Sequence, residues 1–109
     1  MRVFLGAAMA ALLAFPAAAQ SPRPDQAQFR DIYKELVETN TTLSSGSCTL
    51  AAQRMAARLK AAGFSESDLH LIVPAANPKE GALVAVLPGR NPHAKAVLLL
   101  GHLDVVEAK

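Results

Sequence analysis

The chain has 109 residues, of which 51% are apolar, so it has room for at most one domain and is not expected to be disordered over most of its length. Eleven Lys and Arg residues stand against nine Asp and Glu, and the basic residues are scattered without a cationic run. This distribution lacks the basic patch typical of nucleic-acid binding, and no nucleic-acid partner is predicted.

The first nineteen residues have the layout of a secretory signal peptide. A short positive start, Met1-Arg2, precedes an almost wholly apolar run over residues 3–15 and the small-residue cleavage sequence of residues 17–19. The apolar run is too short for a bilayer, which needs about 20 residues. We therefore predict a signal peptide over residues 1–19, a mature part over residues 20–109 that is periplasmic or secreted, and no membrane partner after cleavage.

The mature part is predicted to begin with a leader and a helix. Residues 20–24 are polar and carry two prolines, so they form a disordered leader, and order is expected from near Asp25. Apolar residues then recur at the spacing of one helix face, which predicts a helix that ends near Thr39. The residues of this face are Phe29, Ile32, Tyr33, Leu36 and Val37.

A second helix is predicted over residues 50–62, after a loop rich in Thr, Ser and Gly. Ser47 or Thr49 can cap its start, and Gly63 supplies a left-handed residue at its end. Its apolar stripe comprises Ala52, Met55, Ala56 and Leu59, and its solvent face comprises Gln53, Arg54, Arg58 and Lys60.

Three strands are predicted after the helices, over residues 68–73, 82–87 and 96–100. The connections are too short for a parallel crossover, so neighbouring strands that pair should run antiparallel. The third segment is continuously apolar, which is typical of a strand covered on both faces. Two helices hardly provide that cover, so the chain is expected to be a truncated part of an α/β fold.

The motif that carries chemistry directly follows this third strand. In an extended backbone, residues i and i+2 point to the same side, so the imidazole of His102 and the carboxylate of Asp104 should share one face. Metal sites use this arrangement, because a carboxylate that accepts one ring N–H fixes the tautomer while the other nitrogen binds the ion. A structural interpretation competes with it, in which His102 caps the strand and Asp104 is a surface partner.

The other polar candidates carry less information. His70 alternates with apolar residues and is predicted to face solvent, and His93 lies in a Pro-containing turn. The single cysteine, Cys48, is predicted to be either a buried small residue or paired with a thiol outside this sequence.

The segment AVLLLGHLDVV, preceded by GALVAVLPGR, resembles the entry to the active site of a zinc peptidase family. The family includes aminoacylase, the acetylornithine and succinyl-diaminopimelate deacetylases and glutamate carboxypeptidase. Its order of helix, Ser/Gly loop, helix and strand pair before the His-x-Asp strand is similar to the order predicted here. The resemblance covers residues 25–109 and implies the N-terminal part of a mixed-sheet catalytic domain, with elements in the order helix, helix, strand, strand, strand.

By this resemblance, His102 would ligate one ion of a two-zinc (Zn2+) centre, and Asp104 would be the catalytic carboxylate that holds its imidazole. The family's bridging Asp, Glu-Glu pair and remaining ligands would lie beyond Lys109, so the fragment alone is expected to be inactive. The implied activity is hydrolysis of peptides or N-acyl amino acids, by an exopeptidase, dipeptidase or deacylase that could form a homodimer through a lid domain outside this sequence. Glu107 departs from the family pattern, which often has Pro there.

Two other functions compete with this interpretation. An α/β-type serine hydrolase also has a buried strand followed by a His/Gly element, but there His precedes Gly, whereas here Gly101 precedes His102. In a secreted, non-catalytic binding domain, His102 and Asp104 would be structural. The residues that follow Lys109 would separate the three functions. An Asp and a Glu-Glu pair would support the zinc enzyme, a nucleophile elbow would support the serine hydrolase, and the absence of both would support the binding domain.

Overall fold

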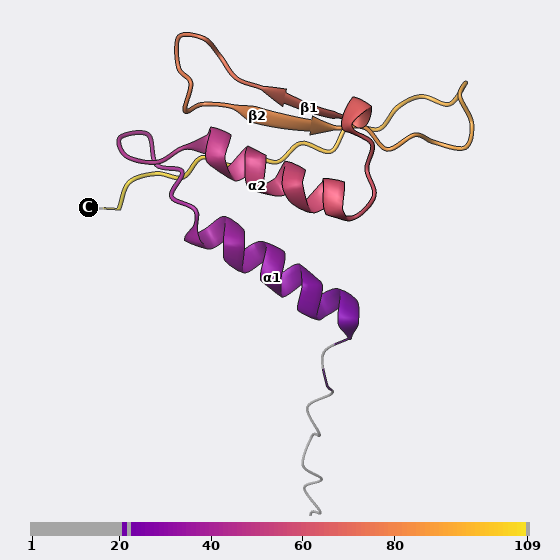
Figure 1. Ribbon diagram of the computed structural model, residues 1–109, viewed down its shortest axis with the longest axis horizontal. Helices are drawn as coiled ribbons and strands as arrows, with labels where there is room; N and C mark the ends of the chain where they lie inside the picture. Colours follow the sequence, from indigo (N-terminus) through magenta and orange to yellow (C-terminus); the bar gives the residue numbers. More distant parts are fainter. Residues whose placement is uncertain (1–20, 22, 109) are drawn as a thin grey trace, which may run out of the picture.

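The computed structural model describes residues 21 and 23–108, in which two α-helices precede a short 3₁₀ helix and two β-strands (Figure 1). The predicted signal peptide and its cleavage site lie outside the described residues. Within the described part of the chain, no helix is long and apolar enough to cross a membrane.

Helix α1, Pro24–Glu38, begins one residue before the predicted start of order. Proline is suited to the first helical turn because its missing N–H needs no partner there. The backbone N–H of the N-cap residue Arg23 donates to Gln26 Oε1 over 2.9 Å. The predicted helix is therefore confirmed, and Pro24 belongs to it and not to the leader.

The contact between α1 and α2 differs from the prediction. Arg54 and Arg58 were expected to face solvent, but Arg54 Nη1 donates to Thr39 Oγ1 over 2.6 Å and Arg58 forms an ion pair with Glu35. These arginines lie one turn apart on α2, so both reach the polar side of α1. Three members of the predicted apolar face of α1 stay exposed, namely Phe29, Tyr33 and Val37.

Helix α2, Cys48–Ala61, has the predicted caps. Ser47 is the N-cap, and its Oγ accepts from the N–H of Leu50 over 3.1 Å. At the C-terminus, Gly63 has φ +97°, and the N–H of Phe64 donates to the carbonyl of Leu59 over 3.1 Å. This pairing is the Schellman motif, which satisfies carbonyls that the helix itself leaves without partners.

Strands β1, Leu69–Ile72, and β2, Ala82–Ala85, form an antiparallel hairpin in which Leu71 pairs with Leu83. The predicted antiparallel pairing is confirmed. Helix α2 packs against the hairpin (Figure 1). The small side chains of Ala51 and Ala52 are fully buried at 0% exposure, so the core of the described residues lies around the first turns of α2.

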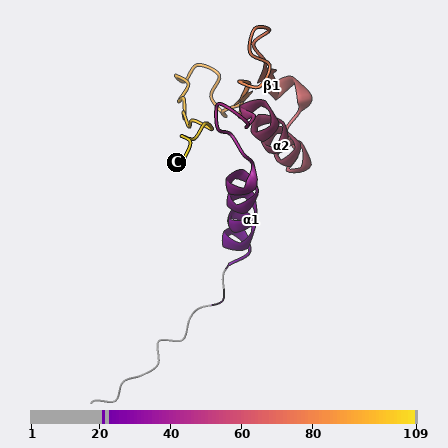
Figure 2. The same cartoon turned by 90° about the vertical axis from the view of Figure 1, so that its left-hand side faces the viewer.

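The predicted third strand is wrong for the described chain. Residues 96–100 are irregular, and the side chains from Val97 to Leu100 are 81–91% exposed. A strand needs a neighbour for its backbone groups, and this segment lies apart from the hairpin (Figure 2). The predicted three-strand mixed sheet is therefore replaced, in residues 21 and 23–108, by a partial α/β fold with one two-stranded antiparallel sheet.

Candidate functional site

The segment that carries His102 is held against the loop that follows α1. Thr41 Oγ1 donates to the carbonyl of Leu103 over 2.7 Å, and Thr42 forms an isolated parallel bridge with Val105. Further along, Glu107 Oε1 accepts from the N–H of Ser44 over 2.9 Å, and hydrogen bonds from Ser44 lower the pKa of the Glu107 carboxyl below its usual value. Glu107 thus anchors the segment to the loop.

The loop of residues 39–46 owes its shape to short polar side chains and one glycine. Asn40 Oδ1 accepts from the N–H of Thr42 over 3.0 Å and from its hydroxyl over 2.8 Å, which closes a tight Asx turn. The N–H of Gly46 then donates to the carbonyl of Thr42 over 2.9 Å. A Cβ at Gly46 would lie 2.6 Å from that carbonyl oxygen, so only glycine fits this close approach.

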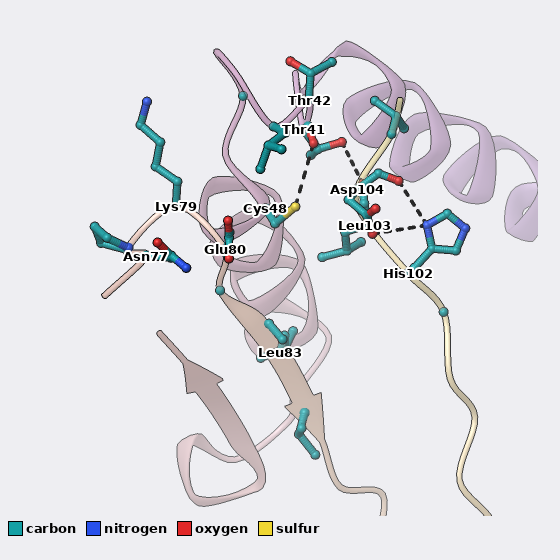
Figure 3. Close-up of a pocket in the computed structure, with 18 of the residues that line it drawn as sticks. Thr41, Thr42, Cys48, Asn77, Lys79, Glu80, Leu83, His102, Leu103 and Asp104 are labelled. Carbon is teal, nitrogen blue, oxygen red and sulfur yellow. Dashed lines mark hydrogen bonds and ion pairs between the residues drawn. The ribbon is translucent and has the colours of Figure 1, made fainter. Parts of the chain in front are cut away.

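His102 and Asp104 are brought together as the spacing predicts (Figure 3). The ring Nδ1 lies 3.0 Å from the backbone carbonyl oxygen of Asp104 and 3.4 Å from its carboxylate Oδ1. A carbonyl and an ionised carboxylate only accept hydrogen bonds, so Nδ1 must be the donor. In the neutral ring, the lone pair then lies on Nε2, which is the form that a metal ligand requires.

The surroundings of the pair differ from the prediction. His102 and Asp104 were expected at the end of a buried central strand, but their side chains are 84% and 76% exposed. The preceding residues 96–100 pair with no strand in the described chain, so nothing covers the pair from that side. The geometry within the motif is therefore local, set by the i, i+2 spacing, and does not depend on a sheet.

Beside the pair lies a hollow of about 870 Å³, bounded by the loop after α1, the start of α2, the hairpin and residues 100–105 (Figure 3). Cys48 lines it as a free, half-buried thiol whose Sγ lies 3.9 Å from the carbonyl of Thr41. Burial raises the pKa of this thiol, and the negative charges of Asp104 and Glu80 raise it further. Cys48 is thus neither fully buried nor paired within the described residues, and pairing with a thiol outside this sequence stays a prediction.

The hairpin wall of the hollow is attached to α2 through hydrogen bonds of one residue, Thr49. Thr49 Oγ1 donates to the carbonyl of Pro78 over 2.7 Å and accepts from the N–H of Gly81 over 2.7 Å. The N–H of Thr49 also donates to the carbonyl of Lys79 over 3.0 Å. This attachment brings Glu80 to the hollow. Sequence reasoning gave Thr49 only a capping role, because it cannot show which loop a hydroxyl meets.

The remaining histidines lie where the sequence places them. His70 is exposed on β1, and His93 is exposed in a turn. Among the described residues, no group of three or more His, Cys, Asp or Glu side chains is arranged to hold a metal ion. Comparisons with protein-family models, with curated proteins and with solved structures find no match.

Proposed function

We propose that this protein is a secreted, zinc-dependent hydrolase of amide or peptide bonds, in which His102 is a metal ligand and Asp104 positions its ring. One observation carries the proposal: Nδ1 of His102 faces two acceptor oxygens of Asp104, at 3.0 and 3.4 Å. This leaves Nε2 as the nitrogen available to an ion. The resemblance of residues 25–109 to the zinc peptidase family supports the choice of metal and reaction.

The donor chemistry of the pair fits zinc. Neutral imidazole is a preferred zinc ligand, and a carboxylate on the opposite ring nitrogen raises its basicity. When bound, zinc activates a water molecule and polarises the amide carbonyl. The work of this chain is to hold the ring: Asp104 fixes the proton on Nδ1, and the bond from Thr41 to Leu103 fixes the backbone between the two residues.

The proposal requires partners for His102, because a catalytic zinc site has about three protein ligands. The family resemblance implies two zinc ions, with a bridging Asp, a Glu general base and a distant His. The proposed substrates are peptides or N-acyl amino acids, and the proposal includes exopeptidase, dipeptidase and deacylase activities. The predicted homodimer would depend on a lid domain and is part of the same proposal.

The test uses the protein expressed from its whole reading frame, with metal analysis and a panel of dipeptides and N-acyl amino acids. Asp104→Asn keeps the shape of the side chain but removes its charge, and should lower zinc affinity or activity by about 10–100-fold. His102→Ala should abolish both zinc binding and hydrolytic activity. His70→Ala is the matched control, because His70 is exposed on β1, and it should behave as the wild type.

A non-catalytic binding domain is the second candidate. The hydrogen bond between the His102 ring and the backbone of Asp104 also stabilises an exposed segment without any metal. In that case the protein binds no zinc, hydrolyses no amide and responds to His102→Ala only through local order. A serine hydrolase would instead hydrolyse the panel without metal and lose activity when a serine nucleophile is substituted.

A further inference from the structure

Thr41 meets the segment that carries His102 at two points, one on each side of Asp104. Its hydroxyl donates to the carbonyl of Leu103 over 2.7 Å, and its own carbonyl accepts from the N–H of Val105 over a longer 3.5 Å (Figure 3). Thr41 itself is inside the fold, at 5% exposure. A hydrogen bond with a partner in such surroundings is stronger than one in open water, because fewer water molecules compete for it.

These two contacts hold both peptide units that flank Asp104. The carbonyl of Leu103 belongs to the peptide unit before Asp104, and the N–H of Val105 belongs to the unit after it. Each peptide unit is planar, so one anchored atom limits how the whole unit can turn. Thr41 therefore restricts the two backbone torsions of Asp104, and with them the direction in which its carboxylate leaves the chain.

The peptide unit after Asp104 also carries an acceptor of the His102 ring. The carbonyl oxygen of Asp104 lies 3.0 Å from Nδ1 of His102, and it shares this unit with the N–H that donates to Thr41. The unit thus accepts from the ring at one end and donates to the loop at the other. Hydrogen bonds linked in this way polarise one another, by perhaps about 10–30% per bond.

We propose that Thr41 is a positioning residue for His102: it orients the two peptide units around Asp104 and so holds Nδ1 of the ring against its acceptors. The inference rests on the proposed function in one respect, because it takes His102 as the metal ligand. A ring held in this way directs Nε2 outward with its lone pair free, so zinc binding does not have to displace a proton from that nitrogen. Without the Thr41 hydroxyl, the ring should turn more freely and exchange its proton between the two nitrogens.

Nitrogen NMR of the His102 ring is the direct test, in the metal-free protein expressed from its whole reading frame and at a pH where the ring is neutral. The wild type should carry the proton mainly on Nδ1. Thr41→Val keeps the branched shape but removes the hydroxyl, and should raise the share of the tautomer protonated on Nε2 several-fold. Thr41→Ser keeps the hydroxyl and should restore the wild-type ratio. An unchanged ratio in Thr41→Val overturns the proposal.

Zinc affinity, measured by competition with a chelator in the same protein, is the second readout. Loss of a direct partner of a metal-ligating histidine weakens metal binding by about 10–100-fold, and Thr41 acts one hydrogen bond further from the ring. Thr41→Val should therefore weaken zinc binding by a smaller factor, roughly 3–10-fold. Thr41→Ser should bind zinc as tightly as the wild type does.

Thr42→Val is the matched control, because it makes the same change at the next residue. The hydroxyl of Thr42 donates to Asn40 Oδ1 over 2.8 Å, and this bond lies within the loop. A positioning role predicts that only Thr41→Val changes the tautomer ratio and the zinc affinity. If both Val variants lower Tm alike and leave the tautomer ratio unchanged, Thr41 has a merely structural role and the proposal is wrong.

The two readouts distinguish failure of this inference from failure of the proposed function. If the wild type binds zinc and Thr41→Val binds it equally tightly with an unchanged ring, the zinc site stands and Thr41 does not position it. If the wild type binds no zinc, the proposed function fails, and the tautomer ratio alone then decides whether Thr41 orients the ring.

Discussion

Two regions of this chain are organised differently. From Thr39 to Ala85, loop, helix and hairpin are joined by buried contacts, including the fully buried Ala51 and Ala52 and the shared hydroxyl of Thr49. From residue 86 to residue 108, the chain is irregular, and it is held mainly through Thr41, Thr42 and Ser44 of the loop. The first region therefore has a packed core of its own, whereas the second depends on neighbours distant in sequence.

The largest effect is expected at Gly46, which shapes the loop that joins the two regions. A Cβ there would meet the backbone of Thr42 and lie 2.7 Å from the carbonyl oxygen of Asn40, and backbone atoms move only at high energy. Gly46→Ala should lower the free energy of unfolding by about 3 kcal/mol in urea denaturation followed by circular dichroism. Gly89→Ala is the matched control in the second region, where a Cβ meets no atom within 4 Å.

Gly89→Ala should leave stability unchanged or raise it by about 0.4–1 kcal/mol, because it only restricts the unfolded chain. If Gly46→Ala and Gly89→Ala lowered the free energy of unfolding equally, the two regions would be equally ordered, and the contrast between them would be wrong.

A smaller loss is expected at Thr49, which holds the hairpin on α2. Thr49→Val keeps the shape of the side chain but leaves the buried N–H of Gly81 and the carbonyl of Pro78 without their partner. The free energy of unfolding should fall by about 2–3 kcal/mol. Thr49→Ser retains the hydroxyl and should lose less than about 1 kcal/mol. If Thr49→Val and Thr49→Ser lower the free energy of unfolding equally, the hydroxyl does not organise the first region.

The smallest effect concerns the contact between the regions at Cys48. Burial, Asp104 and Glu80 all raise the pKa of this thiol, in that order, so little reactive thiolate is present at neutral pH. Asp104→Asn removes a negative charge, which lowers the pKa and should speed alkylation of Cys48 by iodoacetamide at pH 8. The gain should be a few-fold at most, because solvent and salt screen the charge.

Glu80→Gln should also speed alkylation, since Glu80 belongs to the first region and acts on the same thiol. Glu66→Gln is the control, because that exposed carboxylate pairs with Lys60. If Glu80→Gln speeds the reaction and Asp104→Asn does not, the segment of residues 100–105 does not lie against the first region in solution.

Sequence patterns predicted helix α1 and most of the first region. The apolar spacing in α1, the caps at Ser47 and Gly63 and the short connection between β1 and β2 are all observed. Each of these signals acts between residues close in the chain. The same reasoning was wrong for residues 96–100, because composition indicates that a segment suits a buried strand but does not supply its neighbour.

The candidate site also has one part that the sequence predicts and one part that it does not. The proximity of His102 and Asp104 follows from their spacing, and the structure reproduces it outside any sheet. The roles of Thr41, Glu107 and Cys48 could not be predicted from the sequence. These roles depend on contacts between the folded loop and the segment of residues 100–108. No pattern of spacing links residues so far apart in the chain.

By itself, the sequence determined the two helices, their caps, the antiparallel hairpin and the contact between His102 and Asp104. Only the tertiary structure decided that α1 meets α2 through one ion pair and a hydrogen bond, that the apolar residues 97–100 are uncovered, and that a hollow lies between β2 and residues 100–105. The physical reason is the separation along the chain between the residues that interact. Helix periodicity, caps and turns are settled within a few residues, whereas strand pairing and burial depend on which distant segment is brought alongside.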